Sequence, residues 1–260
     1  MPGPGKKSMR TLPTGLEPVT DVHMHLIPGV DDGATDLEMA MSLLRRAREE
    51  GIGTVCATPH SSAFDWDPAL VRERFQDLRQ ESARLFPDMA LYLGCEVYCD
   101  ARHMADVAKA LEEGRYPGLN GTKYLLTEFS VGTLPEQALR CAGEILRLGW
   151  IPVIAHMERY RHLRHNTELV DRLREMGCRI QINAYSLYNE EDADIRSWAR
   201  KLALEQKADF LGTDAHRTWH RPPSAARGVA WLFENTPGEY ARALCGGNAR
   251  RLLGLGEKEV

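Results

Sequence analysis

Hydrophobic residues along the chain form short runs separated by longer amphipathic segments. A continuous apolar run such as residues 151–155 is typical of a strand buried on both faces of a parallel sheet. We expect seven strands of this general kind. They cover residues 18–23, 54–58, 90–97, 124–129, 151–155, 179–183 and 208–213.

Helical sequence follows each predicted strand. Thr35 and Glu38 have the spacing of a capping box, and the helix that they begin should end at Gly51. Asp67 and Pro68 start a second helix, with the proline at the first helical position. The alternation of strands and helices favours a parallel α/β sheet, either a closed barrel or an open doubly wound sheet. Further helices are expected over residues 104–113, 135–148, 168–176, 190–205, 225–234 and 238–244.

The composition is that of one globular domain. The chain has 260 residues, of which 43% are hydrophobic and 27% are charged. We assign the domain to residues 18–253, preceded by a disordered leader (1–17) and followed by a C-terminal tail (254–260). The formal net charge of −4 and the lack of basic stripes argue against a nucleic-acid partner.

Nothing in the sequence indicates export or membrane insertion. No apolar run approaches the roughly 18 residues of a membrane span, and the leader has no apolar signal-peptide centre. The six cysteines include no CxxC pair, so we expect reduced thiols in the core. These features predict a cytoplasmic protein.

Residue types that bind metal ions follow the predicted strands. In parallel α/β barrels, side chains at the C-terminal ends of the strands meet in one site. Imidazole together with carboxylate suits Zn²⁺, Mn²⁺ or Fe²⁺. Nine such residues are too many for one ion, so we expect two or three divalent ions with bridging carboxylates. The candidates are His23, His25, Asp32, His60, Glu96, Glu128, His156, Asp214 and His216.

Other polar residues are interpreted differently. Gln181 and Asn183 end the sixth predicted strand. Asp31 is a weaker candidate than Asp32, and its expected role is to shape the loop. Four further histidines lie in helical or loop segments and are expected at the surface: His103, His162, His165 and His220.

Several of these stretches together resemble a known family. They are DVHMH (21–25) with GVDDG (29–33), ATPH (57–60), AHMERY (155–160), and DAH (214–216) followed by RPP (221–223). In this order they resemble the polymerase-and-histidinol-phosphatase (PHP) superfamily. GCEVY (94–98), EFS (128–130) and QIN (181–183) fit its bacterial tyrosine-protein phosphatase branch, which accompanies capsule and exopolysaccharide export. The resemblance covers roughly residues 18–253.

The resemblance implies a distorted seven-stranded (β/α) TIM-like barrel, the PHP fold, with three divalent ions. Mn²⁺ is expected, with Zn²⁺ or Fe²⁺ as alternatives. Two arginines around the phosphate match Arg159 and Arg221. Tyr185 stands where a small residue is common, and it could narrow the substrate entrance. The implied groupings are His23, His25, Glu96 and Asp214 for one ion, Glu96, Glu128 and His156 for the second, and Asp32, His60 and His216 for the third.

The implied activity is the hydrolysis of phosphotyrosine by a metal-activated hydroxide, since a bound metal lowers the pKa of water from about 15.7 to about 7. The implied substrate is a phosphotyrosine protein, the tail of a bacterial tyrosine kinase that regulates capsule synthesis. Members of the family include small forms and rings, so a homo-oligomer stays open.

Three other functions compete. One is another PHP phosphoesterase, such as a histidinol-phosphate phosphatase or a nuclease. The second is a non-enzymatic docking module for a polysaccharide export complex. The third is a cysteine-based phosphatase, because Cys141 with Arg147 and Cys245 with Arg251 have Cys-x5-Arg spacing. The first pair lies in a predicted helix, and the second lacks a preceding strand.

Overall fold

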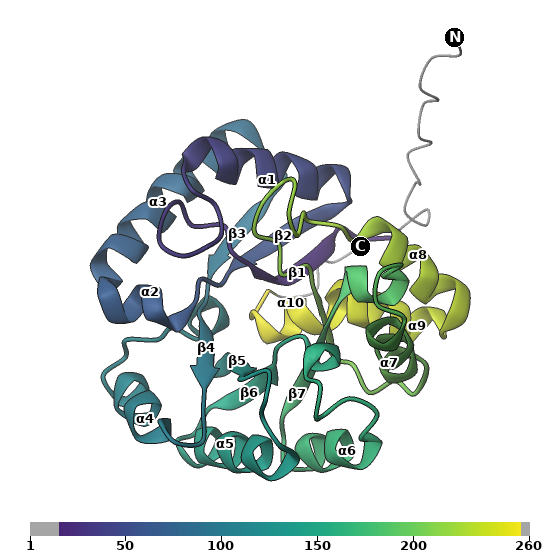
Figure 1. Cartoon of the computed structure of the whole chain (residues 1–260). Helices are drawn as coiled ribbons and strands as arrows, with labels where there is room; N and C mark the ends of the chain where they lie inside the picture. The colour runs from purple at the N-terminus through teal and green to yellow at the C-terminus, as the bar shows by residue number, and fades with distance from the viewer. Residues whose placement is uncertain (1–15, 256–260) are drawn as a thin grey trace.

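The computed structural model describes residues 16–255. The predicted leader and tail lie outside the described residues, apart from two residues at the inner end of each. Within the described range, parallel strands alternate with helices, and the helices surround the strands (Figure 1). The strands are β1 (Val19–Met24), β2 (Ile52–Ala57), β3 (Ala90–Leu93), β4 (Glu96–Cys99), β5 (Tyr124–Phe129), β6 (Ile151–Ile154), β7 (Arg179–Asn183) and β8 (Phe210–Gly212).

The strands form two parallel sheets, of order β1-β2-β3 and β4-β5-β6-β7-β8. The prediction of a parallel α/β fold is therefore confirmed. The eight strands do not form the expected single closed sheet of seven strands. The single strand expected over residues 90–97 was wrong, because Gly94 and Cys95 interrupt it. A Cβ at Gly94 would lie 2.8 Å from Leu119 Cδ2 and 3.1 Å from Thr58 Cγ2, so a side chain at this break would have little room.

The helices largely follow the predicted positions. Asp67 caps α3 with Pro68 in its first turn, as expected. The capping residue of α1 is Asp36 rather than Thr35, since its carboxylate accepts from Met39 N at 2.8 Å. The short helices α2 and α10 were not predicted. The helices are α1 (Leu37–Glu49), α2 (Ser61–Trp66), α3 (Pro68–Leu85), α4 (Met104–Glu112), α5 (Pro135–Arg147), α6 (Thr167–Glu175), α7 (Ala193–Leu204), α8 (Ala226–Asn235), α9 (Gly238–Arg242) and α10 (Asn248–Leu252).

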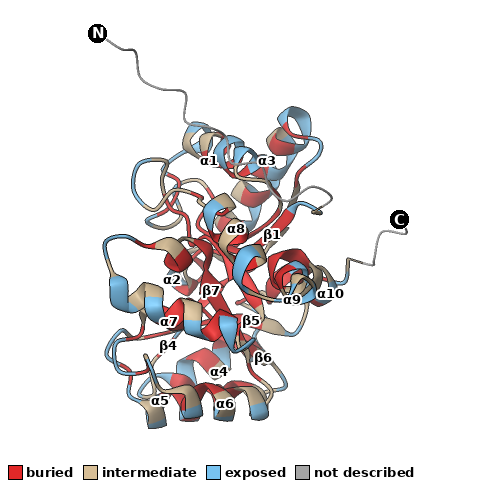
Figure 2. Ribbon diagram, turned by 90° about the vertical axis from the view of Figure 1, so that its right-hand side faces the viewer, coloured by how far each residue is buried: buried red, intermediate tan, exposed pale blue. Residues whose placement is uncertain are grey.

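Two hydrophobic clusters hold this arrangement together. The larger one lies between the strands and the surrounding helices, whose outward faces are exposed (Figure 2). The smaller one lies among the strands, where Val22, Leu126 and Val153 meet Leu252 at the end of α10. On β5 the side chain two residues after Leu126 is Glu128, on the same face of the strand. The strand faces that begin in an apolar core therefore end in polar side chains.

The structure also bears on the cysteines and on membrane insertion. All six cysteines are free and buried, as predicted. None of the helices within residues 16–255 combines the length and the apolar character needed to cross a membrane.

Candidate metal centre

The nine candidate ligands converge on one region, at the carboxyl ends of the strands. Their ligand atoms form four overlapping groups, and within each group these atoms lie within 4.8 Å of one another. The groups are His25, Asp32, His60 and His216; His23, Glu96 and His156; His23, His25 and Asp214; and His60, Glu96 and Glu128.

Glu96 lies at the centre of this cluster and is 1% exposed. Its Oε1 lies 3.1 Å from both His23 Nε2 and His156 Nε2. Its Oε2 lies 3.2 Å from His25 Nε2 and 3.0 Å from His60 Nδ1. Burial alone would raise the pKa of Glu96, but the surrounding histidines, His23 first, hold that pKa well below its usual range.

A second carboxylate, Asp32, faces two imidazoles from the outside. Its Oδ1 lies 3.3 Å from His60 Nε2 and 3.4 Å from His216 Nε2. Unlike Glu96, its side chain is 63% exposed. The cluster therefore reaches from a buried centre to the solvent, and a small molecule can approach it from the Asp32 side.

The geometry differs in one respect from the groupings that the resemblance implied. His60 was assigned with Asp32 and His216, and that set is present together with His25. His60 also lies beside Glu96 and Glu128, which were assigned to another ion. His60 therefore lies between the positions expected for the second and the third ion.

The donor set fits divalent cations. His23 Nε2 and His25 Nε2 face each other at 3.2 Å, both fully buried. Two imidazole nitrogens at this distance share at most one proton. Together with the carboxylates of Glu96 and Asp214 they would hold a divalent cation, which would satisfy the lone pairs of all four side chains. Mixed imidazole and carboxylate ligands are those of Zn²⁺, Mn²⁺ and Fe²⁺ sites.

Gln181 supports two of the candidates from behind. Its Oε1 accepts from His156 N at 2.8 Å and lies 3.3 Å from His23 Nδ1. Because a backbone N–H only donates, the atom that it meets is the oxygen, and His23 Nδ1 must be the donor. His23 therefore turns the Nε2 lone pair toward Glu96. The Gln181 amide in turn donates to Asn183 Oδ1 at 2.8 Å.

Asp31 has the loop-shaping role expected of it and a further one. Its Oδ1 accepts from Gly33 N at 3.0 Å, which closes the loop. Its Oδ2 lies 2.7 Å from His25 Nδ1, so it orients that imidazole as Gln181 orients His23.

The role of Asp21 was not anticipated. Its carboxylate accepts from His23 N and Thr213 N, both at 3.0 Å, and from Thr213 Oγ1 at 2.5 Å. Asp21 thereby ties β1 to the end of β8. The period-2 pattern of Asp21, His23 and His25 was the available signal, since alternate strand residues face the same way.

Arg159 and Arg221 both contact Asp214. Each donates to Asp214 Oδ2, whereas Oδ1 of the same carboxylate lies 3.4 Å from His23 Nε2. Although burial alone would raise the pKa of Asp214, His23 and the two arginines hold it well below its usual range. The arginine side chains are 34% and 30% exposed, so each guanidinium lies beside the cluster and also reaches solvent.

Backbone strain gathers at the same place. Of the six non-glycine residues with positive φ within residues 16–255, three are His156 (30°), Asp214 (53°) and Arg221 (54°). Side chains rarely adopt this conformation, and it persists where the surroundings hold it in place, often at functional sites. The fold maintains unfavourable backbone angles in order to aim these side chains at the cluster.

The remaining histidines belong to none of the four ligand groups, although His103 lines a cavity that it shares with His60 and Glu128. All four are exposed, as predicted. His165, for example, pairs with Asp194 at 2.6 Å on the surface.

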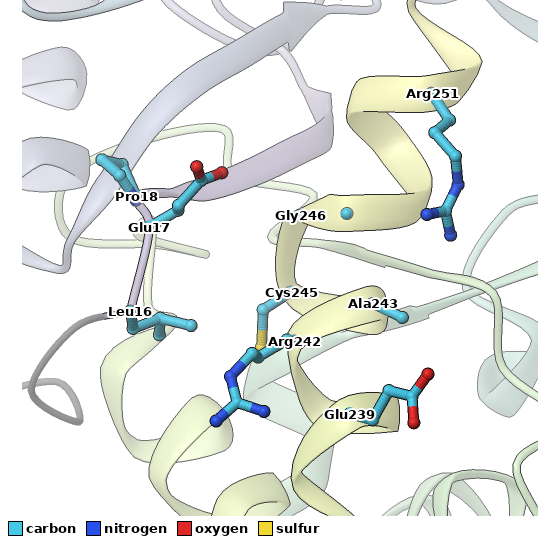
Figure 3. Close-up of a pocket in the computed structure, with 10 residues that line it drawn as sticks. Leu16, Glu17, Pro18, Glu239, Arg242, Ala243, Cys245, Gly246 and Arg251 are labelled. Atoms are coloured by element: carbon cyan, nitrogen blue, oxygen red, sulfur yellow. The ribbon is translucent and has the colours of Figure 1, made fainter. Parts of the chain in front are cut away.

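Neither cysteine candidate has the properties of a nucleophile. Cys141 lies inside α5, and burial raises the pKa of its thiol to about 11. Cys245 lies in a π-helical turn (Ala243–Gly247), and burial raises the pKa of its thiol to about 12. Figure 3 shows Cys245 among the residues of a pocket that none of the nine candidate ligands lines. Residues 245–251 are helical, so their amides do not form an open phosphate loop.

The fold and the cluster together define an α/β protein with a candidate multi-metal site. The sequence model of the family "Capsular polysaccharide synthesis, CpsB/CapC" matches residues 19–254. The chain belongs to this family, and the resemblance found in the sequence is thereby confirmed.

Individual relatives agree with this assignment. The tyrosine-protein phosphatase CpsB of Streptococcus agalactiae serotype III (strain NEM316) is 29% identical over 240 residues, which cover 90% of this chain and 97% of the relative. The tyrosine-protein phosphatase YwqE of Bacillus subtilis (strain 168) is 32% identical over 198 residues, covering 75% and 76%. A crystal structure from a study of YwqE from Bacillus subtilis and CpsB from Streptococcus pneumoniae, described there as metal-dependent tyrosine phosphatases, matches with a TM-score of 0.81 and 29% identity, covering 92% and 96%.

Proposed function

We propose that this protein is a metal-dependent protein-tyrosine phosphatase, a phosphoric monoester hydrolase of the capsular polysaccharide system. The observation that carries the proposal is the single cluster of five imidazoles and four carboxylates with two arginines beside it. The relatives that cover nearly the whole chain are tyrosine-protein phosphatases, which supports the same activity.

The two sheets can be understood as one distorted barrel of the PHP type. His25 N donates to Ala215 O at 2.9 Å and Asp214 N donates to His23 O at 2.8 Å, which links β1 to the segment after β8. Glu96 N donates to Pro59 O at 3.0 Å, which links β4 to the segment after β2. These bonds support a ring in which β3 and β4 are one bent strand, giving the seven strands of the expected fold.

We assign all nine candidate residues as ligands of two or three divalent ions, with Glu96 as a bridge. Mn²⁺ is the proposed ion, with Zn²⁺ and Fe²⁺ compatible with the same donors. When bound, the ions would neutralise phosphate oxygens and lower the pKa of a water molecule that serves as nucleophile.

The protein's own part in the reaction is to hold and orient the phosphate. Arg159 and Arg221 present planar guanidinium groups that match pairs of phosphate oxygens, and both side chains are partly exposed. Asp214 holds both arginines toward the cluster. Fixed positive charge at this position stabilises the charge that develops on the phosphoryl oxygens during transfer.

A phosphotyrosine substrate suits this arrangement. Its leaving group is a phenolate with a pKa of about 10, which departs with less proton assistance than an alkoxide. We propose the tyrosine-containing tail of a bacterial tyrosine kinase as the physiological substrate and the cytoplasm as the location. A homo-oligomer is compatible with the proposal, and neither nucleic acid nor membrane insertion is part of it.

Two other functions remain as alternatives. A histidinol-phosphate phosphatase would use the same metals, and only the choice of substrate separates it from the proposal. A non-enzymatic docking module would need no strained histidine and aspartate backbones at the cluster, so the backbone angles of His156 and Asp214 count against it.

The test is metal analysis and a substrate panel on one preparation. We expect two or three divalent ions per chain, loss of activity with a chelator, recovery with Mn²⁺, and faster turnover of phosphotyrosine peptides than of phosphoserine peptides. Equal or better turnover of histidinol phosphate would overturn the substrate assignment. Full activity of metal-free protein would overturn the mechanism.

A further inference from the structure

A cavity of about 370 Å³ adjoins the metal centre, which is within the size range of ligand-binding pockets. We call it the side groove. It shares His60 and Glu128 with the candidate centre, so the groove and the centre are adjacent. The lining residues used below are His60, Asp65, Tyr98, His103, Asp106 and Glu128.

Three carboxylates and two histidines, His60 and His103, line the side groove, whereas neither lysine nor arginine does. Its three carboxylates differ in how they are already engaged. Asp65 pairs with Arg115 at 2.9 Å and accepts from Tyr116 Oη at 2.7 Å. Glu128 belongs to the candidate metal centre. Asp106, in the first turn of α4, forms no ion pair within residues 16–255, although it lines the groove.

Tyr98 supplies a second feature of the groove. It lies on β4, two residues after Glu96, and is 45% exposed although it is aromatic. An exposed ring beside an unpaired carboxylate is suited to a long cationic side chain. The methylene stem packs along the ring, and the charged end meets both the ring face and the carboxylate.

Arg159 and Arg221, which we assign to the phosphate, do not line the groove. The cationic and anionic parts of the surface near the centre are therefore separate. A substrate that matches both parts of the surface carries a phosphate, which binds over the metal centre beside the arginines, and a positive charge, which binds a short distance away in the side groove.

We propose that the side groove binds a lysine or arginine side chain that flanks the phosphotyrosine of the substrate, with Asp106 as its charge partner and Tyr98 as its platform. The inference rests on the proposed phosphatase function and extends it to a preference for basic residues next to the phosphorylated tyrosine. Charge complementarity of this kind sets partner choice more than it sets total affinity.

The experiment compares phosphotyrosine peptides that differ at one position. Metal-loaded protein is given peptides with Lys, Ala or Glu at each of the three positions on either side of the phosphotyrosine, and kcat/KM is measured. We expect Lys to be preferred over Glu by about twofold to fivefold at one or two positions, the scale of an exposed ion pair. Asp106→Asn should bring this ratio close to one, and Asp106→Lys should invert it.

The matched control is Asp77→Lys, which reverses an exposed charge on α3 away from the groove and should keep the parent ratio. Tyr98→Ala should reduce the Lys preference, whereas Tyr98→Phe, which keeps the ring, should preserve it. Equal turnover of all flanks by the parent protein would overturn the groove assignment, as would a Lys preference unchanged in Asp106→Lys. Failure of the parent to hydrolyse even the alanine-flanked peptide would instead overturn the phosphatase function on which it rests.

Discussion

Replacement of Gln181 by leucine is predicted to weaken metal binding without removing any ligand. Gln181 is fully buried, and its Oε1 is the acceptor for His156 N and for His23 Nδ1. Leucine has a similar volume but no acceptor. His156 N–H then lacks a partner, and His23 loses the bond that turns Nε2 toward Glu96.

The expected size follows from these contacts. Loss of a hydrogen bond that orients a metal-binding histidine typically lowers metal affinity about 10-fold to 100-fold, or about 1.4 to 2.7 kcal/mol. Gln181 orients one candidate ligand through its ring and a second through its backbone, so we expect the upper half of this range. Gln181→Glu keeps both acceptors, and Asn183 can turn its amide to donate to the new carboxylate. That variant should bind metal nearly as well as the parent.

The assay is a titration of metal-free protein with Mn²⁺, followed by the EPR signal of the free ion, with thermal melting as a check on folding. Gly212→Ala is a harsher change at the same place, because a Cβ at residue 212 would lie 2.8 Å from both Gln181 Nε2 and His23 Cβ, and it should therefore weaken Mn²⁺ binding at least as much. If Gln181→Leu is folded and binds Mn²⁺ within twofold of the parent, the orienting role is wrong.

Three further predictions concern charge, thiols and pH. Arg159→Ala or Arg221→Ala should each lower kcat/KM on a phosphotyrosine peptide by about 10²-fold, or about 2.7 kcal/mol, with only partial rescue by lysine. The assay is run at saturating Mn²⁺, where metal content should be unchanged, because both arginines contact the candidate ligand Asp214. Near-parent kcat/KM in both would make them surface charges. Cys245→Ser should retain activity, and the native thiols should react with Ellman's reagent at pH 8 only after unfolding, since burial raises the pKa of Cys245 to about 12. Burial raises the pKa of Asp21 from 3.8 to about 6 in the folded protein, so protonation of Asp21 favours folding. The stability that the protonated form contributes at low pH is lost as pH rises through about 6. Asp21→Asn should therefore gain stability relative to the parent from pH 4 to 7, by about 3 kcal/mol at most, in urea unfolding of chelated protein; a difference that does not vary with pH would contradict this.

Local pattern in the sequence was sufficient for the order of the elements and for the residues that end the strands. A strand is recognised by a short apolar run, and the polar residue after it, such as His60 or His156, is identified without any knowledge of the fold. Parallel strands bring those ends to the same side, so the convergence of the nine candidates could be expected from chain order alone. The family resemblance added the pairing of these residues with Arg159 and Arg221.

The tertiary structure decided what depends on contacts between distant segments. The strand breaks at Gly94, where Leu119 and Thr58 leave little room for a side chain, and no local signal reports that contact. The sequence likewise did not reveal that Asp21 holds Thr213, that Gln181 serves both His23 and His156, or that Asp106 faces the side groove without a partner. Strand periodicity identifies the face on which a side chain lies. Which atom meets it across the sheet depends on register, backbone angle and rotamer, and these are set only when the strands pack together.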